Sequence, residues 1–356
     1  MFEKEFFDES LNKNCKLLIV KNNLTETYFQ DFLNRYLNKN IKRIISFDLE
    51  FNTPPKSTNQ RKIAIFQLCF YLKKYNLIIF FNPLLVSDQT NNLMHSILIN
   101  HKIIKMGHGT DSLDIPAIYN YLNSVEKCIK FTINLYDTRF LCEYLNIITD
   151  NKLCNIYYLL EKFNVITEKQ KNWLFENEKK LGNFWDKVID ITNLSSELRD
   201  YSMYDALYIK KLLISMKNNI NDKYIFLLLN ELTRLVFLLK KNIFIIDNIT
   251  YLNIAFLSNK TKMYDNFLIE YNKYLQNLDN KIVNLFNIGY FKNIIMKILQ
   301  LKYYLKITKK YKVYKSKILT VSNNEIHELN NQWINLYKNL IFFPKFIKLL
   351  DNFLIE

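Results

Sequence analysis

The sequence predicts an α/β domain built on a mixed sheet, followed by a mostly α-helical C-terminal region. Strand-like and helix-like runs alternate over the first two hundred residues, and three of the strand-like runs follow one another with only short turns between them. After about residue 217 the strand signals largely stop, and the apolar positions repeat with a helical period of about 3.6 residues. We therefore divide the chain into a domain of residues 1–217 and a helical, lysine-rich domain of residues 218–356.

Six apolar runs predict the strands of the first domain. They cover Lys16–Val20, Arg43–Phe51, Lys62–Phe70, Leu77–Phe81, Ile103–Met106 and Lys130–Leu135. The second, third and fourth are joined by short turns, so they predict an antiparallel meander.

Runs with helical periodicity predict the helices. In the first domain they cover Glu26–Leu37, Thr90–Asn100, Ile115–Leu122, Thr138–Leu145, Leu153–Phe163 and Ser195–Lys217. In the second domain they cover Lys223–Lys241, Ala255–Leu278, Lys281–Lys310 and Asn324–Leu354.

The composition indicates a soluble, intracellular protein. The 356 residues are 49% hydrophobic and include only 4 Gly and 5 Pro, so a sizeable core is expected. The N-terminus, MFEKEFFDES, is acidic and lacks the apolar stretch of a signal peptide. No run reaches about 18 uninterrupted apolar residues, so we expect no membrane span. The five cysteines show no CxxC spacing, so neither a disulfide framework nor a cysteine zinc site is expected.

Two carboxylates stand out in the second predicted strand, which reads SFDLEFN over residues 46–52. Asp48 and Glu50 are two positions apart, so in a strand they project from the same face. Two like charges on one face are unfavourable unless a cation binds between them, and hard cations such as Mg²⁺ prefer carboxylate oxygens. This stretch alone predicts with equal weight a metal site or a strand whose acidic face is simply wet.

A second acidic segment, HGTDSLDIPAI, covers residues 108–118 between a predicted strand and a predicted helix. Asp111 or Ser112 can cap that helix, with Pro116 in its first turn. Capping explains one of the two acids and leaves Asp114 open to another role.

A third segment, RDYSMYDALYIKKLL, covers residues 199–213. Tyr201 and Asp205 are four positions apart, so they lie on one face of a helix, while Ala206 and Ile209 can supply its apolar side. This pair alone is a weak signal, because both residue types are common in the helices of this chain.

The order of these three segments resembles the DEDD superfamily of 3′–5′ exonucleases, in its tyrosine-bearing branch, and most closely the ribonuclease D-like families. Three further features fit: Gln67 in KIAIFQL, the pair Asp137-Thr138, and Trp185 ahead of the third segment. The family's Arg-Pro-Leu after the tryptophan is absent, since this chain reads WDKVIDITNLS. The resemblance covers roughly residues 12–215 and implies a ribonuclease H-like fold.

The resemblance also implies a site for two divalent ions, Mg²⁺ or Mn²⁺. By analogy with the family, Asp48 would bridge both ions, and Glu50 and Asp205 would complete the site that holds the attacking water. Asp114 would help to hold the second ion, and Tyr201 would orient the water.

Two choices within this set follow from the resemblance. The metal-binding aspartate of the family is normally followed by a large aliphatic residue, which selects Asp114 and leaves Asp111 as the fallback. The other branch of the superfamily uses a histidine in place of the tyrosine. No histidine occurs in residues 195–217, so Tyr201 is the residue available for that role.

The implied activity is the release of nucleoside 5′-monophosphates from the 3′ end of a single-stranded nucleic acid. RNA is favoured as the substrate because the nearest likeness is to ribonuclease D, and DNA is the alternative. A catalytically inactive nucleic-acid-binding protein with the same fold is the alternative of another class. No GxxxxGKS/T phosphate loop occurs, so we expect no nucleotide cofactor.

A concentration of lysines predicts a nucleic-acid-binding surface in the C-terminal region. Residues 280–324 contain ten lysines and no Asp or Glu. Lysines can neutralise phosphates, and tyrosine rings can stack on unpaired bases. Seven residues of this region are expected to bind nucleic acid, and we call them the lysine patch: Lys302, Tyr303, Lys306, Lys309, Lys310, Tyr311 and Lys312. The alternative is a solvated helix face with tyrosines in the core.

Overall fold

The chain forms two compact units, Met1–Asn221 and Asp222–Glu356, and the division in the sequence falls close to the predicted boundary at residue 217. The computed structural model describes residues 1–39, 43–52, 61–149, 154–182, 188–240, 260–311 and 343–353, together with positions 331, 334, 337 and 340. Trp185, Lys312 and much of the predicted helix Asn324–Leu354 lie outside these residues.

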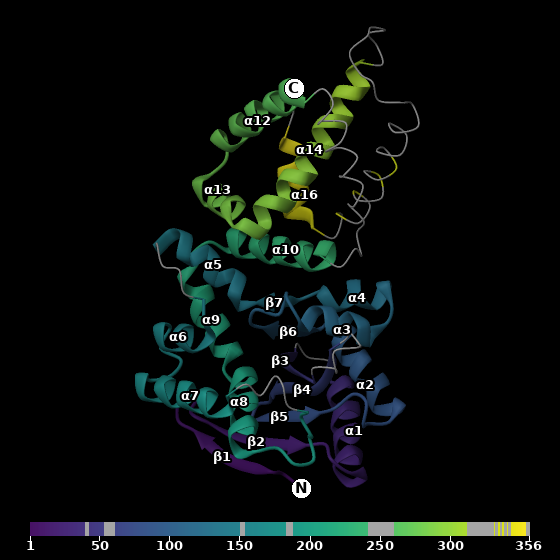
Figure 1. The fold of residues 1–356 in the computed structure, drawn as a ribbon, viewed down its shortest axis with the longest axis vertical. Coiled ribbons are helices and arrows are strands. Elements are labelled where there is room, and N and C mark those ends of the chain that lie inside the picture. Colours follow the sequence, from purple (N-terminus) through teal and green to yellow (C-terminus); the bar gives the residue numbers. More distant parts are fainter. Residues whose placement is uncertain are drawn as a thin grey trace. The chain divides into compact units, whose positions relative to one another are not determined.

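The first unit is built on a mixed seven-stranded sheet with the order β1-β2-β5-β4-β3-β6-β7 (Figure 1). The neighbours β3, β4 and β5 pair antiparallel, which confirms the predicted meander. On the two sides of the meander, β2 and β6 pair with it in parallel. The strands are β1 (Lys4–Asp8), β2 (Lys13–Ile19), β3 (Arg43–Asn52), β4 (Lys62–Tyr71), β5 (Tyr75–Phe81), β6 (Ile103–Gly107) and β7 (Leu135–Asp137).

Aromatic side chains hold the centre of this sheet. Phe66 of β4 and Phe81 of β5 are fully buried and stack with their ring centroids 5.2 Å apart. Phe70 of β4 is also fully buried and meets the ring of Phe32 at 4.9 Å. Each such side chain contributes about 1.5–3 kcal/mol by leaving water. The central strands are therefore firmly placed, including β3, which carries Asp48 and Glu50.

Helices cover both faces of the sheet. In Figure 1, α1 to α4 lie on one side and α6 to α9 on the other. The helices of this unit are α1 (Asn23–Leu37), α2 (Asp88–Ile99), α3 (Asp114–Leu122), α4 (Val125–Thr132), α5 (Thr138–Thr149), α6 (Ile156–Lys162), α7 (Glu168–Leu181), α8 (Ser196–Leu207) and α9 (Ile209–Asn219). The predicted architecture, a mixed sheet flanked by helices and followed by a helical region, is confirmed.

Several predicted elements differ from the structure. The predicted strand Lys130–Leu135 is wrong, because α4 continues to Thr132 and only the end of the run joins β7. Ser124 caps α4 by accepting a hydrogen bond from the Lys127 N–H. The predicted helix Ser195–Lys217 is two helices, α8 and α9, with Tyr208 between them.

The structure also contains elements that the sequence did not predict. β1 is a short edge strand, and α7 is so rich in Lys, Glu and Asn that its apolar period is weak. Cys142 and Cys154 form a disulfide with a Cα–Cα distance of 5.9 Å, which the cysteine spacing did not indicate. A local period cannot reveal that pairing, because it depends on the tertiary packing that brings Cys154 beside Cys142.

The second unit is helical in its described part. Its helices are α10 (Lys223–Lys240), α12 (Lys260–Gln276), α13 (Asn280–Asn287), α14 (Gly289–Tyr311) and α16 (Pro344–Asn352). Glu231 of α10 accepts hydrogen bonds of 3.0 Å from the backbone N–H groups of Lys345 and Phe346. This buried carboxylate therefore satisfies the first turn of α16 and joins two helices distant in sequence.

Within the described residues, no single helix is long and apolar enough to cross a membrane. The pair formed by α13 and the first part of α14 reaches that length and composition together, but it bends by 99°. Length and composition are the only properties that qualify this pair.

Candidate active site

Three carboxylates of the first unit converge. Asp48 and Glu50 come from β3 and Asp205 from α8, and each offers a ligand oxygen within 4.8 Å of the others. Glu50 is 3% exposed and Asp205 is 9% exposed, while Asp48 is partly open to solvent. We call these residues the acidic cluster.

The backbone of β3 and α8 holds the acidic cluster together. Asp48 and Glu50 share one strand face, and the same face carries Ser46. The hydroxyl of Ser46 donates a 2.6 Å hydrogen bond to the carbonyl of Ala206, the residue after Asp205. Because Ser46 is fully buried, this bond ties α8 to the strand beside the acids.

Burial raises the pKa of every acid in the cluster, and repulsion by neighbouring carboxylates adds to the rise for Glu50 and Asp205. Burial raises the pKa of Asp48 to about 7. The pKa of Glu50 lies well above its usual range because of burial and then because of Asp48 and Asp205. The pKa of Asp205 is raised by burial and by Asp48. A bound cation would reverse this repulsion and favour the ionised carboxylates.

Two hydrogen bonds orient Glu50. Its Oε1 accepts a 3.0 Å hydrogen bond from the amide of Gln67 on β4 and a 3.3 Å hydrogen bond from the hydroxyl of Ser202 on α8. Both bonds oppose the rise in the pKa of Glu50. The carboxylate is therefore held in one position with its other oxygen available. Sequence reasoning singled out Gln67 but missed Ser202, which lies three residues before Asp205.

Of the two acids in the second segment, Asp114 is the one whose pKa is raised by the charges of the cluster. It opens α3 and is 8% exposed, and its pKa is raised by burial and then by Asp48 and Glu50. Asp114 nevertheless lies outside the group within 4.8 Å. Asp111 accepts instead from Arg139, with Nη1 at 3.4 Å from Oδ1.

The predicted capping of α3 by Asp111 or Ser112 is wrong. The N-cap residue is Leu113, and no side chain caps the helix. The N–H of Ile115 donates to the carbonyl of Thr110 instead.

Asp137 fixes the loop that leads to Asp114. Its carboxylate accepts the backbone N–H groups of Gly109 and Thr110 at 2.9 and 2.8 Å, and also the Thr110 hydroxyl at 2.8 Å. Gly109 has φ +65°, and a Cβ on Gly107 would meet Thr110 at 2.3 Å, so both positions require glycine. The loop is therefore rigid where it presents Asp114.

Two phenols border the acidic cluster. Tyr201, one turn before Asp205, has a pKa raised well above its usual range by burial and then by Asp205 and Glu50. Tyr157 of α6 is 2% exposed and donates a 3.1 Å hydrogen bond to Oδ1 of Asp205. Sequence reasoning missed Tyr157, because the contact joins residues 48 positions apart and no local spacing marks it.

The described part of the lysine patch is engaged within its own unit. Tyr303 is 8% exposed and packs against Phe267 with ring centroids 5.7 Å apart, so its ring is closed to a base and the prediction for it is wrong. Lys302 is half-buried and donates to the carbonyl of Leu350, and burial lowers its pKa. Lys306 lies at an intermediate depth. Lys312 and the side chains of Lys309, Lys310 and Tyr311 lie outside the described residues.

Comparison with known proteins identifies the family. A profile described as 3′–5′ exonuclease matches residues 21–221, more than half of the chain. The chain belongs to the 3′–5′ exonuclease family. The matched segment contains the acidic cluster, Asp114 and Tyr201, and it ends where the first unit ends. The resemblance to 3′–5′ exonucleases of the DEDD superfamily is therefore confirmed at the level of the family.

The individual proteins named here are at most 32% identical to this chain. An uncharacterized protein of Acanthamoeba polyphaga mimivirus is 32% identical over 333 residues, which are 83% of this chain and 63% of that protein. The chain thus spans less than two thirds of that relative's length. Trypanosoma brucei RNase D has 18% identity and a TM-score of 0.44 over 61% of each chain. Escherichia coli RNase D has 12% identity and a TM-score of 0.38 over 90% of this chain and 74% of its own.

Proposed function

We propose that this protein is a metal-dependent 3′–5′ exonuclease that releases nucleoside 5′-monophosphates, with RNA favoured over DNA. The observation that carries the proposal is the acidic cluster, in which three ligand oxygens lie within 4.8 Å of one another inside a segment of the exonuclease family. Like charges held this close together repel one another, and a bound cation is the simplest way to relieve that repulsion.

The donor set fits Mg²⁺ or Mn²⁺. Asp48, Glu50 and Asp205 offer only carboxylate oxygens, which hard divalent cations prefer. Asp114 lies close enough to Asp48 and Glu50 for their charges to raise its pKa, so it is the candidate ligand for a second ion. Two such ions, when bound, supply an activated water and stabilise the leaving oxygen.

The surrounding residues would position these groups. Gln67 and Ser202 hold Glu50, and Tyr157 holds Asp205. Tyr201 would orient the attacking water through its hydroxyl. It would remain protonated while doing so, because burial and the nearby acids raise its pKa. The phenol therefore acts as a hydrogen-bonding group and the base strength must come from elsewhere.

Preference for RNA rests on the likeness of the sequence segments to the ribonuclease D-like families. DNA remains the alternative substrate, because the proposed chemistry of the acidic cluster acts on the phosphodiester group that RNA and DNA share. Discrimination requires contacts to the 2′-hydroxyl.

The test is digestion of single-stranded RNA and DNA carrying a 5′ label, with Mg²⁺, with Mn²⁺ and with EDTA. We expect stepwise shortening from the 3′ end with either metal, faster for RNA, and none in EDTA. Asp48→Asn should lower the rate by about 10³-fold or more, as loss of a key charge-stabilising group does. The matched control is Asp190→Asn, which removes an exposed aspartate of the same unit and should digest at the wild-type rate.

Failure to shorten either substrate, with binding retained, would favour the inactive nucleic-acid-binding protein. Equal rates for Asp48→Asn and wild type would remove the acidic cluster from the reaction.

A further inference from the structure

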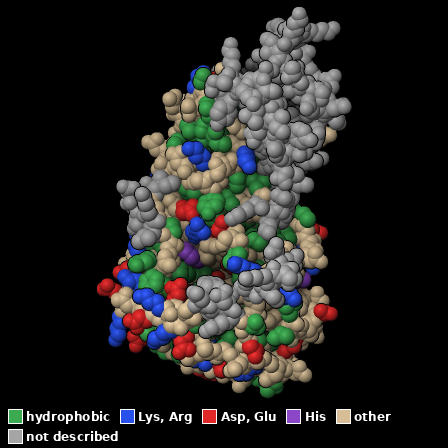
Figure 2. Space-filling view, viewed as in Figure 1, with side chains coloured by type: hydrophobic (Ala, Val, Ile, Leu, Met, Phe, Trp, Pro, Cys, Tyr) green, Lys and Arg blue, Asp and Glu red, His purple; other side chains and the backbone are tan. Residues whose placement is uncertain are grey.

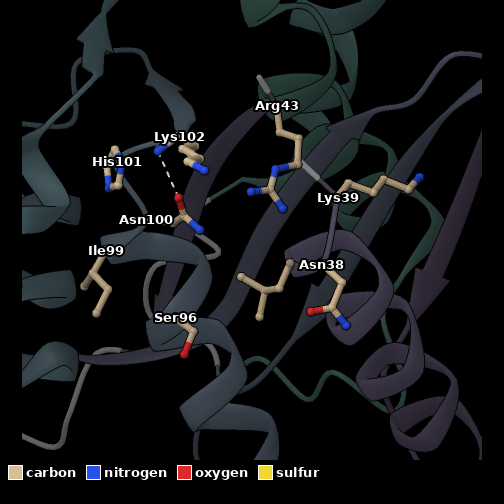
Figure 3. Close-up of a pocket in the computed structure, with 9 residues that line it drawn as sticks. Asn38, Lys39, Arg43, Ser96, Ile99, Asn100, His101 and Lys102 are labelled. Carbon is tan, nitrogen blue, oxygen red and sulfur yellow. Dashed lines mark hydrogen bonds between the residues drawn. The ribbon is translucent and has the colours of Figure 1, made fainter. Parts of the chain in front are cut away.

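A second concentration of charge lies in the first unit, and it has the opposite sign. A cavity of about 580 Å³ opens where the C-terminal ends of α1 and α2 meet the first residues of β3 and β6 (Figure 3). In the part of the chain that the structure describes, no Asp or Glu lines it. We call it the basic pocket, and its polar lining residues are Asn38, Lys39, Arg43, Ser96, Asn100, His101 and Lys102.

Arg43 is the buried cation of the basic pocket. Its side chain is 5% exposed, and Figure 3 shows the guanidinium turned into the space between Asn100 and Lys39. One Nη donates to the carbonyl of Tyr36, and the guanidinium lies 5.3 Å from the Tyr36 ring centroid. Its buried Nε has no hydrogen-bond partner among the residues that the structure describes. An arginine keeps its proton at any ordinary pH, so the wall of the pocket retains this positive charge.

The helix ends do not cancel this charge. Each helix C-terminus carries only about half a negative charge. The carbonyl of Tyr36 already accepts from Arg43, and the carbonyl of Asn100 accepts from the buried Nζ of Lys105 at 3.4 Å. Lys39 and Lys102, both exposed, add two formal positive charges at the rim. The pocket is therefore positive overall.

The amide of Asn100 adds a directed donor. Its Oδ1 accepts from the backbone N–H of Lys102 at 2.9 Å, the bond drawn as a dashed line in Figure 3. The NH₂ group is thereby turned away from Lys102, toward the cavity. A guanidinium, ammonium groups and an amide together suit a ligand with several oxygen acceptors and a negative charge.

We propose that the basic pocket binds a phosphate group, carried either by a free nucleotide or by a nucleic-acid strand. Its volume falls within the range of small-molecule sites, about 300–1,000 Å³, so it has room for more than the phosphate itself. Charge favours a phosphate over a neutral polar ligand, because only an anion can neutralise the buried guanidinium of Arg43.

This phosphate is not the one cleaved at the acidic cluster. Arg43 and Asp48 are five positions apart in β3, which corresponds to about 16 Å along the strand. An odd separation also places their side chains on opposite faces of the sheet. The inference therefore stands apart from the proposed exonuclease activity.

Thermal unfolding of the full chain in EDTA, with increasing inorganic phosphate at constant ionic strength, tests the proposal. Phosphate should raise the unfolding temperature of the wild type, because a ligand that binds only the folded state stabilises it. The double variant Lys39→Gln with Lys102→Gln should need at least about tenfold more phosphate for the same shift. The matched control, Lys73→Gln with Lys74→Gln, removes two exposed lysines of the same unit and should respond as the wild type does.

The same titrations with a nucleoside 5′-monophosphate and with a single-stranded oligoribonucleotide separate the two sources. The source is the one whose stabilisation depends on Lys39 and Lys102. A phosphate response that is absent from the wild type, or equal in all three proteins, overturns the proposal. Using surface lysines avoids Arg43 itself, whose replacement also removes the bond to Tyr36.

Discussion

The strand β3 carries two opposite accumulations of charge, and their chemistry differs. Asp48 and Glu50 belong to the acidic cluster on one face, whereas Arg43 enters the basic pocket on the other. On the face of the molecule seen in Figure 2, acidic and basic side chains are interspersed over the first unit. The two sites differ from that surface because their charges are gathered by sign and partly buried.

The difference between the sites lies in how each can relieve its charge. The carboxylates of the acidic cluster can take up protons, and the pKa of Asp48 is already raised to about 7. Arg43 has no such escape, since a guanidinium stays protonated. The contribution of the acidic cluster to stability should therefore change with pH and with bound metal. The contribution of the basic pocket should change with anion concentration at any ordinary pH.

After the loss expected for Asp48→Asn, the largest effect should distinguish Asp114 from Asp111 as the acid that assists the acidic cluster. Asp114→Asn should lower the rate of digestion by about 10²–10³-fold, because Asp114 is the proposed ligand of the second ion and lies within the electrostatic reach of Asp48 and Glu50. Asp111→Asn should keep most of the rate, because its carboxylate is paired with Arg139. Single-turnover digestion of labelled RNA measures both, and a larger loss for Asp111→Asn would reverse the assignment.

The second effect concerns stability and is confined to the acidic cluster. The pKa of Asp48 is about 7 in the folded chain and 3.8 ordinarily, so folding favours the protonated acid. Its favourable contribution is complete below about pH 4 and is lost as pH rises through about 7. Relative to Asp48→Asn, the metal-free wild type should lose at most about 4 kcal/mol over that interval.

Denaturant unfolding in EDTA, from pH 4 to pH 8, measures this difference. Mg²⁺ should then restore the wild type at pH 8 far more than Asp48→Asn, because the cation stabilises the ionised carboxylates. The basic pocket provides the contrast: phosphate should stabilise the wild type at both ends of this range. If the difference in the free energy of unfolding between the two proteins did not change with pH, burial would not raise the pKa of Asp48.

The contrast between the sites also explains what the sequence could and could not predict. The pairs Asp48 with Glu50 and Tyr201 with Asp205 were found because strand and helix periods fix which neighbours share a face. The meander was found for the same local reason. No local pattern distinguishes Arg43 from the rest of its predicted strand, because its burial depends on Tyr36 at the end of α1 and on the turn after α2. Contacts of that kind are set by tertiary packing and leave no period in the sequence.

The third effect concerns the two phenols that border the acidic cluster, Tyr201 and Tyr157. Tyr201→Phe should lower the rate by about 10–10²-fold without changing substrate affinity, because the hydroxyl would act only on the attacking water. Tyr157→Phe should cost several-fold at most and should raise the metal concentration needed for half-maximal rate, because Tyr157 only orients Asp205. Rate against Mg²⁺ concentration for both variants separates the roles. Equal metal curves for Tyr157→Phe and wild type would make that bond purely structural.

The smallest effect asks whether the lysine patch or the basic pocket meets the strand. Each phosphate contact on a single strand contributes about 0.7 to the slope of log affinity against log salt. If the helical unit guides the strand, replacing Lys306, Lys309 and Lys310 by Gln should flatten that slope, while Lys39→Gln with Lys102→Gln leaves it unchanged. Fluorescence anisotropy of a labelled oligoribonucleotide in EDTA at several salt concentrations provides the slope for each protein. Lys302 is left out because its ammonium already bonds the carbonyl of Leu350. If only the pocket variant flattens the slope, the strand contacts the first unit and the patch is a solvated helix face.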